Sequence, residues 1–188
     1  MRTFATHRPS PGRVTPYVAL LLLVTCFGCP LADPGGVDVD RAVLLNGAAD
    51  TVLVTMSDAI DNGQVEINDD MAAAIVTPEP GATVARATPF KFAWSVPSGK
   101  PADGGRARGT TTSGEFVWLQ LSGGGLARNI DVLAVGVSSW TPTAAEWAEI
   151  SAATGPVTIT LTNALLNGGV LQNGPYRATA PSTFAIAP

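Results

Sequence analysis

The chain has 188 residues, of which 46% are hydrophobic and 14% are charged, and this composition predicts a folded core rather than an intrinsically disordered chain. From residue 30 onward it carries 8 basic and 15 acidic side chains, a net charge of −7. This acidic balance without a basic stripe argues against nucleic acid as a partner, because a phosphate backbone needs cations to neutralise it.

The first 28 residues are predicted to be a signal peptide. Three arginines and no acid precede a short apolar run that follows Tyr17 and ends in small residues, which is the layout of a secretory signal. The run is far shorter than the roughly 20 apolar residues that a membrane-spanning helix needs, and no later segment reaches that length. The protein is therefore expected to be exported without a transmembrane helix.

Cys29 follows this run, directly after Gly28, where an ordinary signal peptide would have its cleavage box. The segment resembles bacterial lipoprotein signals, which implies that Cys29 is lipidated and becomes the mature N-terminus, with residues 29–37 as a tether. Pro30 implies, by the same resemblance, an outer-membrane protein. Several acyl chains anchor almost irreversibly, because each buried methylene contributes about 0.8 kcal/mol. Cys26 is a second candidate for lipidation, and a secreted protein with a disulfide between Cys26 and Cys29 is the alternative.

Cysteine and histidine are missing from the exported part beyond the anchor. The second cysteine lies beside Cys29, and the single histidine, His7, lies in the predicted signal peptide. Zinc sites with Cys or His ligands and Ser-His-Asp or Cys-His catalytic centres therefore cannot form. Acidic residues gather between Asp58 and Asp70, but their spacing does not match an EF-hand loop, and solvated turns explain them more simply. We predict no catalytic residue, no metal and no cofactor.

Residues 38–76 are predicted to form a small β-rich module. An Asn-Gly pair, which favours tight hairpin turns, follows Asp61. Hydrophobic residues alternate on both sides of this pair, at Val52, Val54 and Met56 and at Val65 and Ile67. A lone hairpin is marginal in water, so the module is expected to pack on the larger domain or on a partner.

Residues 77–188 are predicted to form the larger domain, built from strands. Apolar and polar residues alternate in segments 90–96 and 157–162, and Phe184 and Ile186 share one face near the end. Each of these strands offers one apolar face to the core of a sandwich.

One short helix is predicted in this domain. It runs from Thr143 to about Ala152, because Thr143 and Glu146 have the spacing of a capping box. Trp147 and Ile150 are expected to face the core, so that the helix closes one end of the sandwich.

The segment from Val76 to the C-terminus resembles the immunoglobulin-like and fibronectin-III-like domains of exported bacterial proteins. The resemblance lies in the Pro-Glu-Pro-Gly turn at residues 78–81, the aromatic strand ending at Trp94, a second strand at 116–121 and the closing segment 174–186. The inter-sheet cysteine pair of many such domains is missing. The predicted fold class is mainly β: an immunoglobulin-like antiparallel sandwich with one short helix and a small N-terminal β module.

A long loop over residues 98–113 is the first candidate contact site. It gathers Lys100, Arg106 and Arg108 in an otherwise acidic chain. One interpretation is a contact loop for an anionic partner such as a polysaccharide or a phosphate-bearing lipid. The alternative is a flexible, solvated insertion.

The strand from Phe116 to Leu121 is the second candidate contact site. If Val117, Leu119 and Leu121 face the core, then Phe116, Trp118 and Gln120 share the opposite face and could stack on sugar rings or on an apolar patch of a partner. The alternative reverses the faces and buries Trp118 as the central tryptophan of the sandwich.

The leading functional hypothesis is a lipid-anchored, non-catalytic surface protein of the envelope that acts as a binding or structural module. Its partners would be the membrane, through the lipid anchor, and a protein or polysaccharide. One alternative is a carbohydrate-binding module that uses exposed aromatics. The other is a hydrolase that uses two carboxylates such as Asp131 and Glu115 across a cleft.

Overall fold

The structure, a computed structural model, describes residues 37–97 and 109–188, and all of these lie in one compact unit, Gly35–Pro188. The fold is mainly β, as predicted from the sequence, with eleven strands and two helices in the described part of the chain. Neither of these helices is long and apolar enough to cross a membrane.

The larger of two sheets is centred on two long antiparallel strands, β6 and β9, which stay in register from Gly114 opposite Leu166 to Gly123 opposite Val157. Its eight strands are β1 (Val43–Leu45), β2 (Glu66–Ile67), β4 (Ala82–Val84), β6 (Gly114–Gly123), β7 (Ile130–Val135), β9 (Val157–Asn167), β10 (Val170–Arg177) and β11 (Ser182–Ile186). The order is β1-β7-β6-β9-β10-β2, and β11 joins β4 to the other part of β9.

The larger sheet is mixed, whereas the sequence predicted an antiparallel sandwich. β1, β2 and β4 pair in parallel with β7, β10 and β11. Parallel pairing requires long connections between partners rather than tight turns, and these three short strands all precede their partners by a large stretch of chain. Alternation within a segment does not reveal the direction of a distant partner.

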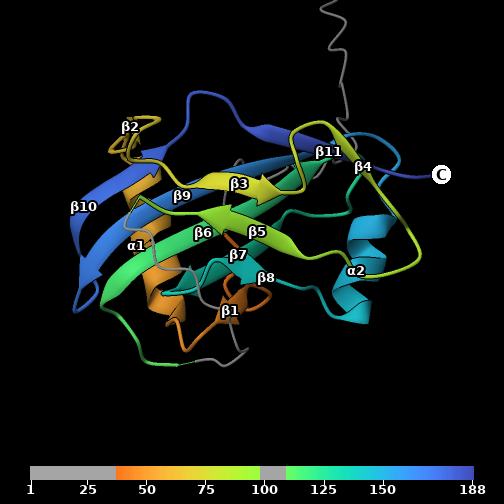
Figure 1. The fold of residues 1–188 in the computed structure, drawn as a ribbon. Helices are drawn as coiled ribbons and strands as arrows, with labels where there is room; N and C mark the ends of the chain where they lie inside the picture. Colours follow the sequence, from red (N-terminus) through yellow and green to blue (C-terminus); the bar gives the residue numbers. More distant parts are fainter. Residues whose placement is uncertain (1–36, 98–108) are drawn as a thin grey trace, which may run out of the picture. The chain divides into compact units, whose positions relative to one another are not determined.

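The smaller sheet covers one face of the larger one (Figure 1). It consists of β3 (Ala74–Thr77), β5 (Phe92–Ser95) and β8 (Ser139–Trp140), all antiparallel. The predicted alternation of β5 is confirmed, because Phe92 and Trp94 are buried while Ser95 is exposed. Phe92 stacks on Trp140 at 5.3 Å between ring centroids and meets Phe184 edge-on at 5.6 Å, so aromatic rings fill the core between the sheets.

Helix α2 (Ala144–Ser151) confirms the predicted short helix. The Thr143 side chain accepts a hydrogen bond from the Glu146 backbone, and the Glu146 carboxylate accepts one from the Thr143 backbone, which completes the capping box. Trp147 and Ile150 are buried in the core between the sheets. The helix lies at one end of the sandwich, beyond β8 (Figure 1).

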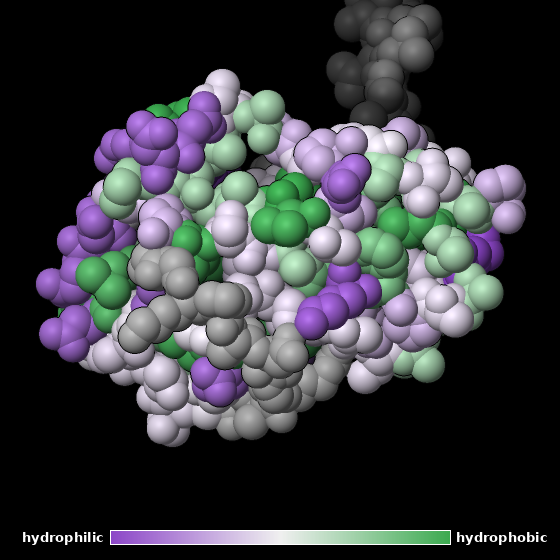
Figure 2. All heavy atoms as spheres, in the orientation of Figure 1, coloured by the Kyte–Doolittle hydropathy of each residue, from purple (hydrophilic) through white to green (hydrophobic). Residues whose placement is uncertain are grey.

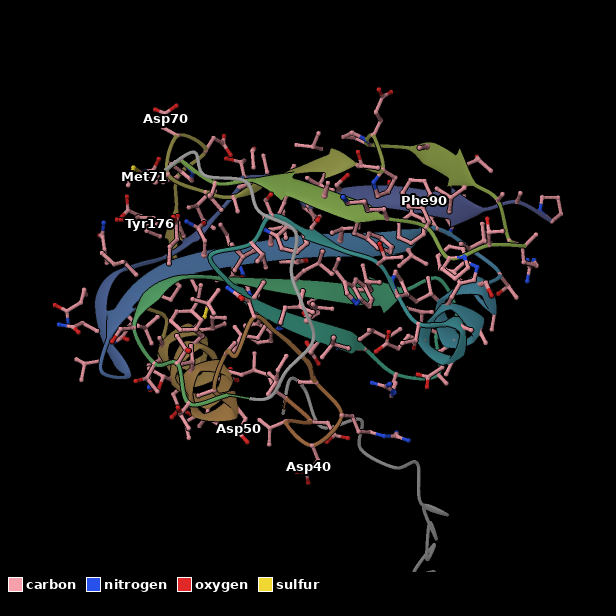
Figure 3. The ribbon with its side chains drawn as sticks, turned by 60° about the horizontal axis from the view of Figure 1, so that its bottom comes forward. Asp40, Asp50, Asp70, Met71, Phe90 and Tyr176 are labelled. Carbon is pink, nitrogen blue, oxygen red and sulfur yellow. The ribbon has the colours of Figure 1, made fainter. Side chains whose placement is uncertain are left out.

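Helix α1 (Asp50–Asp61) occupies the segment for which the sequence predicted a strand, and that prediction is wrong. Val52, Leu53 and Met56 are buried, a spacing that fits the 3.6-residue period of a helix, whereas Val54 is 44% exposed. The helix packs on the face of the larger sheet opposite the smaller sheet and forms a second core. In Figure 3, Asp50 at the start of α1 and Met71, shortly before β3, lie on opposite sides of the larger sheet.

The Asn62-Gly63 pair ends α1 instead of turning a hairpin. The Gly63 backbone donates to the Ile60 carbonyl at 2.9 Å, and the Gln64 backbone donates to the Ala59 carbonyl at 2.9 Å. This is a Schellman motif, which needs a residue at positive φ, and Gly63 has φ of 71°. The requirement for glycine is the same as in a hairpin turn, so the pair alone does not distinguish the two.

The second predicted strand of the N-terminal module is present as β2, but it pairs with β10 rather than with a neighbouring hairpin strand. Helix α1, from the first predicted domain, and strands β6 and β9, from the second, share one core. Another Asn-Gly pair, Asn167-Gly168, does turn a hairpin, because Asn167 of β9 pairs with Val170 of β10 across two glycines.

Candidate functional site

Four predicted site residues lie outside the described residues. Cys29, the predicted lipidation site, belongs to the N-terminal segment, and Lys100, Arg106 and Arg108 belong to the loop between β5 and β6. Their predicted roles in anchoring and in contacting an anionic partner stay predictions.

Phe116 and Trp118 are buried, which corrects their prediction as ligand contacts. Val117, Leu119 and Leu121 do face the core between the sheets, so Phe116 and Trp118 point to the opposite face. That face is not solvent-exposed, because α1 covers it, and the exposed fractions of Phe116 and Trp118 are 0% and 4%. The prediction of an exposed face assumed a single core, whereas the larger sheet has a core on each face.

Gln120 is partly buried, and its amide, like the Trp118 indole, is bound to a carboxylate. Trp118 Nε1 donates to Asp131 Oδ1 at 2.9 Å, and Gln120 Nε2 donates to the same oxygen at 3.1 Å. Buried carboxylates need such donors. Asp131 therefore satisfies polar groups at the edge of the second core.

Asp131 and Glu115 cannot act together across a cleft, as the hydrolase alternative requires. Asp131 pairs with Gln120 and shares its face, on the α1 side of the larger sheet. Glu115 precedes Phe116 by one residue, so its side chain points to the other face. The sheet itself separates the two carboxylates.

Aromatic side chains do not form an exposed platform in the described part of the chain. The seven aromatic residues Phe92, Trp94, Phe116, Trp118, Trp140, Trp147 and Phe184 are at most 4% exposed, Tyr176 is 8% exposed and Phe90 is partly buried. On the face shown in Figure 2, hydrophobic residues lie in small separate areas rather than in one broad patch. The flat stacking surface of a carbohydrate-binding module is not found among these side chains.

A cleft opens where β9 changes its partner. β10 pairs with β9 from Asn167 to Asn163, and β11 pairs with it from Ile159 to Val157. Residues 160–162 therefore have no strand partner on this edge, and the linker between β10 and β11 bends away from them (Figure 1). The resulting cleft has a volume of about 510 Å3, within the range of ligand sites. We call it the fork cleft; it is lined by residues 73–75, Pro80, 159–161, 177–178 and 180–182.

Both sides of the larger sheet contribute to the fork cleft. Ile159 and Leu161 belong to the core between the sheets, and Ile75 packs against that core. Thr160, between them in sequence, points to the α1 side by strand alternation. The cleft therefore has a mainly apolar lining toward the smaller sheet, with Thr160 toward the other face.

Among the described residues, Arg177, the last residue of β10, is the only charged one that lines the fork cleft. Its Nε donates to Thr162 Oγ1 at 2.7 Å. No ion pair links Arg177 to a carboxylate of residues 37–97 or 109–188. Burial lowers the pKa of the Arg177 guanidinium, because partial removal from water disfavours the charged form. An arginine still stays protonated at neutral pH, so the cleft holds one poorly solvated positive charge.

Ser182 provides a second polar group at the other end of the fork cleft. Its Oγ is buried and makes no hydrogen bond in the structure. Ser182 pairs with Ile159 across the ladder and so lies on the side of the smaller sheet. A buried hydroxyl without a partner costs free energy unless a ligand or water satisfies it.

Two sets of hydrogen bonds hold the walls of the fork cleft. Asn163 Oδ1 accepts from the Ala73 backbone at 2.7 Å, and its Nδ2 donates to the Met71 carbonyl at 3.0 Å, which fixes the entry to β3. Asp69 accepts from the backbone and the hydroxyl of Thr179 at 2.8 and 2.9 Å, which fixes the linker. These hydrogen bonds lower the pKa of Asp69, the backbone one most. The walls are therefore held in place without a ligand.

A second cleft, of about 400 Å3, differs in the exposure of its charged residues. Arg41, Arg128 and Glu149 line it. Arg128 is neutralised by Glu149 at 2.8 Å, and both side chains are solvent-exposed in part. Arg41 leaves this cleft with the same net charge of +1 as the fork cleft, but Arg41 is exposed whereas Arg177 is partly buried, and this makes the fork cleft the better candidate for an anionic ligand.

Arg177 was not among the predicted site residues. One signal was present in the sequence: Arg177 is the only basic residue after Arg128, and it lies between Pro175 and Pro181, residues that disfavour a continuous central strand. The sequence does not show that β9 changes from one partner strand to another at this point.

Comparison of the chain with protein-family models, with curated proteins and with solved structures gave no match.

Proposed function

We propose that this protein is a lipid-anchored, non-catalytic binding module of the bacterial envelope and that the fork cleft is its ligand site. The observation that carries the proposal is Arg177, a partly buried guanidinium in a preformed cleft without a carboxylate partner among the described residues. Leaving such a charge unpaired costs stability, and the cost is understandable if a ligand completes the site.

Anchoring is supported by the sequence of the N-terminal segment. A basic start and a short apolar run lead to Gly28-Cys29, as in bacterial lipoprotein signals, and Pro30 favours the outer membrane. Residues 29–37 then form the tether between the anchor and the folded domain. Acyl chains on Cys29 would keep the cleft close to the membrane surface.

Binding rather than catalysis is supported by the chemistry of the fork cleft. Its lining consists of apolar side chains, Thr160, Ser182 and the guanidinium of Arg177. A general acid or base at neutral pH is usually a histidine or a carboxyl group with a shifted pKa, and none is among the residues that line this cleft. The site can hold and orient a ligand by charge and hydrogen bonds.

We also propose that the fold is a relative of the immunoglobulin-like sandwich. Two sheets packed around an aromatic core that includes Trp94 support this proposal. Three parallel strand pairs and helix α1 are additions to that plan. The likeness carries no function, because such sandwiches serve adhesion, spacing and binding alike.

Anchoring is tested by labelling cells with a palmitate analogue and by mass spectrometry of the N-terminal peptide. The Cys29→Ala variant is expected to lose the label and to remain uncleaved, while Cys26→Ala, the matched control, keeps both label and processing. A label that persists in Cys29→Ala would show that the anchor has been assigned to the wrong residue.

Ligand binding is tested by native mass spectrometry of the anchored protein extracted from its own envelope. The wild type is expected to carry an additional mass of a small molecule. Ala180→Trp, which places a large ring at the exposed rim of the fork cleft, is expected to lose that mass. An adduct that is unchanged in Ala180→Trp would contradict the cleft as the ligand site.

A further inference from the structure

The fork cleft sets an upper limit on the length of its ligand. Along β9 the cleft is closed by the pair Asn163–Tyr176 at one end and by the pair Ile159–Ser182 at the other. The three residues between these pairs span about 10 Å, at roughly 3.3 Å per residue. A long extended peptide cannot lie along this gap, whereas a compact small molecule can.

Arg177 determines the charge of the ligand. A guanidinium has five N–H donors, and the bond from Nε to Thr162 uses one, so the four terminal N–H groups remain for a ligand. These terminal groups match the two oxygens of a carboxylate or a phosphate. Because the lining contains a single positive charge, a group with one negative charge can be neutralised there, whereas a phosphate dianion would remain with an uncompensated charge.

The other lining residues indicate the polarity of the part of the ligand that lies away from its anionic group. Ile75, Pro80 and Pro181 present the accessible apolar surface of the cleft, whereas Ile159 and Leu161 are 2% and 8% exposed and belong to the core between the sheets. At the far end, the unpartnered Ser182 Oγ can donate one hydrogen bond and accept another. The cleft therefore fits a molecule that has an anionic end, a compact apolar body and one small polar group or water at Ser182.

We propose that the fork cleft binds a small monocarboxylate with a compact apolar body, whose carboxylate pairs with the Arg177 guanidinium and whose body contacts Ile75, Pro80 and Pro181. This inference rests on the proposed function and adds the chemical class of the ligand. Burying the apolar body supplies affinity, while the charge pair fixes the orientation.

The test uses the full chain in detergent and 19F NMR with three probes of the same shape. These are 4-fluorophenylacetate, its uncharged amide 4-fluorophenylacetamide, and 4-fluorophenyl phosphate. The carboxylate is expected to bind with saturable shifts and to bind about tenfold or more tightly than the amide, because a charge-assisted pair is lost in the amide. The phosphate is expected to bind more weakly than the carboxylate.

Four variants locate the binding and identify its cause. Arg177→Gln is expected to weaken the carboxylate about tenfold or more and to leave the amide unchanged, while Arg177→Lys restores part of the loss by retaining the charge. Ala180→Trp is expected to abolish binding of all probes. Arg128→Gln is the matched control, because it removes an arginine from an exposed ion pair elsewhere, and it should bind like the wild type.

The outcomes separate this inference from the proposed function. If the amide binds as tightly as the carboxylate and Ala180→Trp abolishes both, the fork cleft is a ligand site but the carboxylate assignment is wrong. If Arg177→Gln binds the carboxylate like the wild type, the assignment is also wrong. If no probe shifts with the wild type while the adduct in the envelope extract is lost in Ala180→Trp, the ligand belongs to another class. If neither is observed, both proposals are overturned.

Discussion

Replacing Trp118 by alanine tests whether this side chain is part of a core or of a surface platform. Trp118 is 4% exposed beneath α1, and its indole donates to Asp131 at 2.9 Å. Truncating a buried tryptophan costs about 3 to 5 kcal/mol, through lost burial and the cavity that remains. A domain of this size loses roughly 2 to 4 °C in Tm per kcal/mol, so Trp118→Ala is expected to lower the Tm by about 6 to 20 °C.

The assays are thermal unfolding, which gives the Tm, and urea unfolding, which gives the free energy; both are followed by far-UV circular dichroism, since removing a tryptophan would alter a fluorescence signal. Trp118→Phe separates the two contributions: it keeps most of the volume and removes the indole hydrogen bond, at an expected cost of about 1 to 3 kcal/mol. Val54→Ala is the control, because Val54 is 44% exposed on the outer face of α1, and it should change stability by less than about 0.5 kcal/mol. A cost below about 1 kcal/mol for Trp118→Ala would refute the two-core arrangement.

Three further predictions concern the polar contacts of the fold. Asn163→Ala is expected to lower the free energy of unfolding in urea by about 2 to 4 kcal/mol, because the Ala73 amide and the Met71 carbonyl lose their hydrogen-bond partner. A change near zero would mean that Asn163 does not fix the entry to β3. Thr143→Ala is expected to cost about 1 kcal/mol by removing the helix cap, and Thr143→Ser should recover most of it. The pKa of Asp69 is lowered in the folded protein, so the contribution of its bonds to Thr179 is present above the unfolded pKa and is lost as the pH falls below about 4. The Thr179 amide resonance should follow that titration in NMR spectra, and Asp69→Asn should remove it; an unchanged titration in the variant would contradict the assignment.

The sequence predicted those elements whose signals are local. The capping box at Thr143 and Glu146 involves only neighbouring residues, and α2 begins where that signal placed it. The alternation in β5 and β9 likewise depends on the period of the strand alone, so Phe92, Trp94 and Ile159 lie inward as predicted.

Elements that depend on distant contacts were not predictable in the same way. Val52, Leu53 and Met56 fit the helical period, but Val52, Val54 and Met56 fit the strand period equally well, and Gly63 suits either a helix end or a hairpin. Helix α1 buries its apolar side chains against the second face of the larger sheet. A prediction that assumed a single core did not allow for an element on that face. For the same reason, the burial of Trp118 beneath α1 could not be predicted.

The fork cleft has a topological origin, which explains why no motif marks it. β9 has eleven residues, more than either β10 or β11 covers along its outer edge, so a gap remains where one partner ends and the other begins. Packing alone would close such a gap, because apolar side chains collapse into unfilled space. Here Asn163 fixes the entry to β3 and Asp69 fixes the linker, so directional hydrogen bonds hold both walls apart. A site held open in this way needs little rearrangement to accept a ligand, and the Arg177 guanidinium in its lining favours the anionic ligand that we propose.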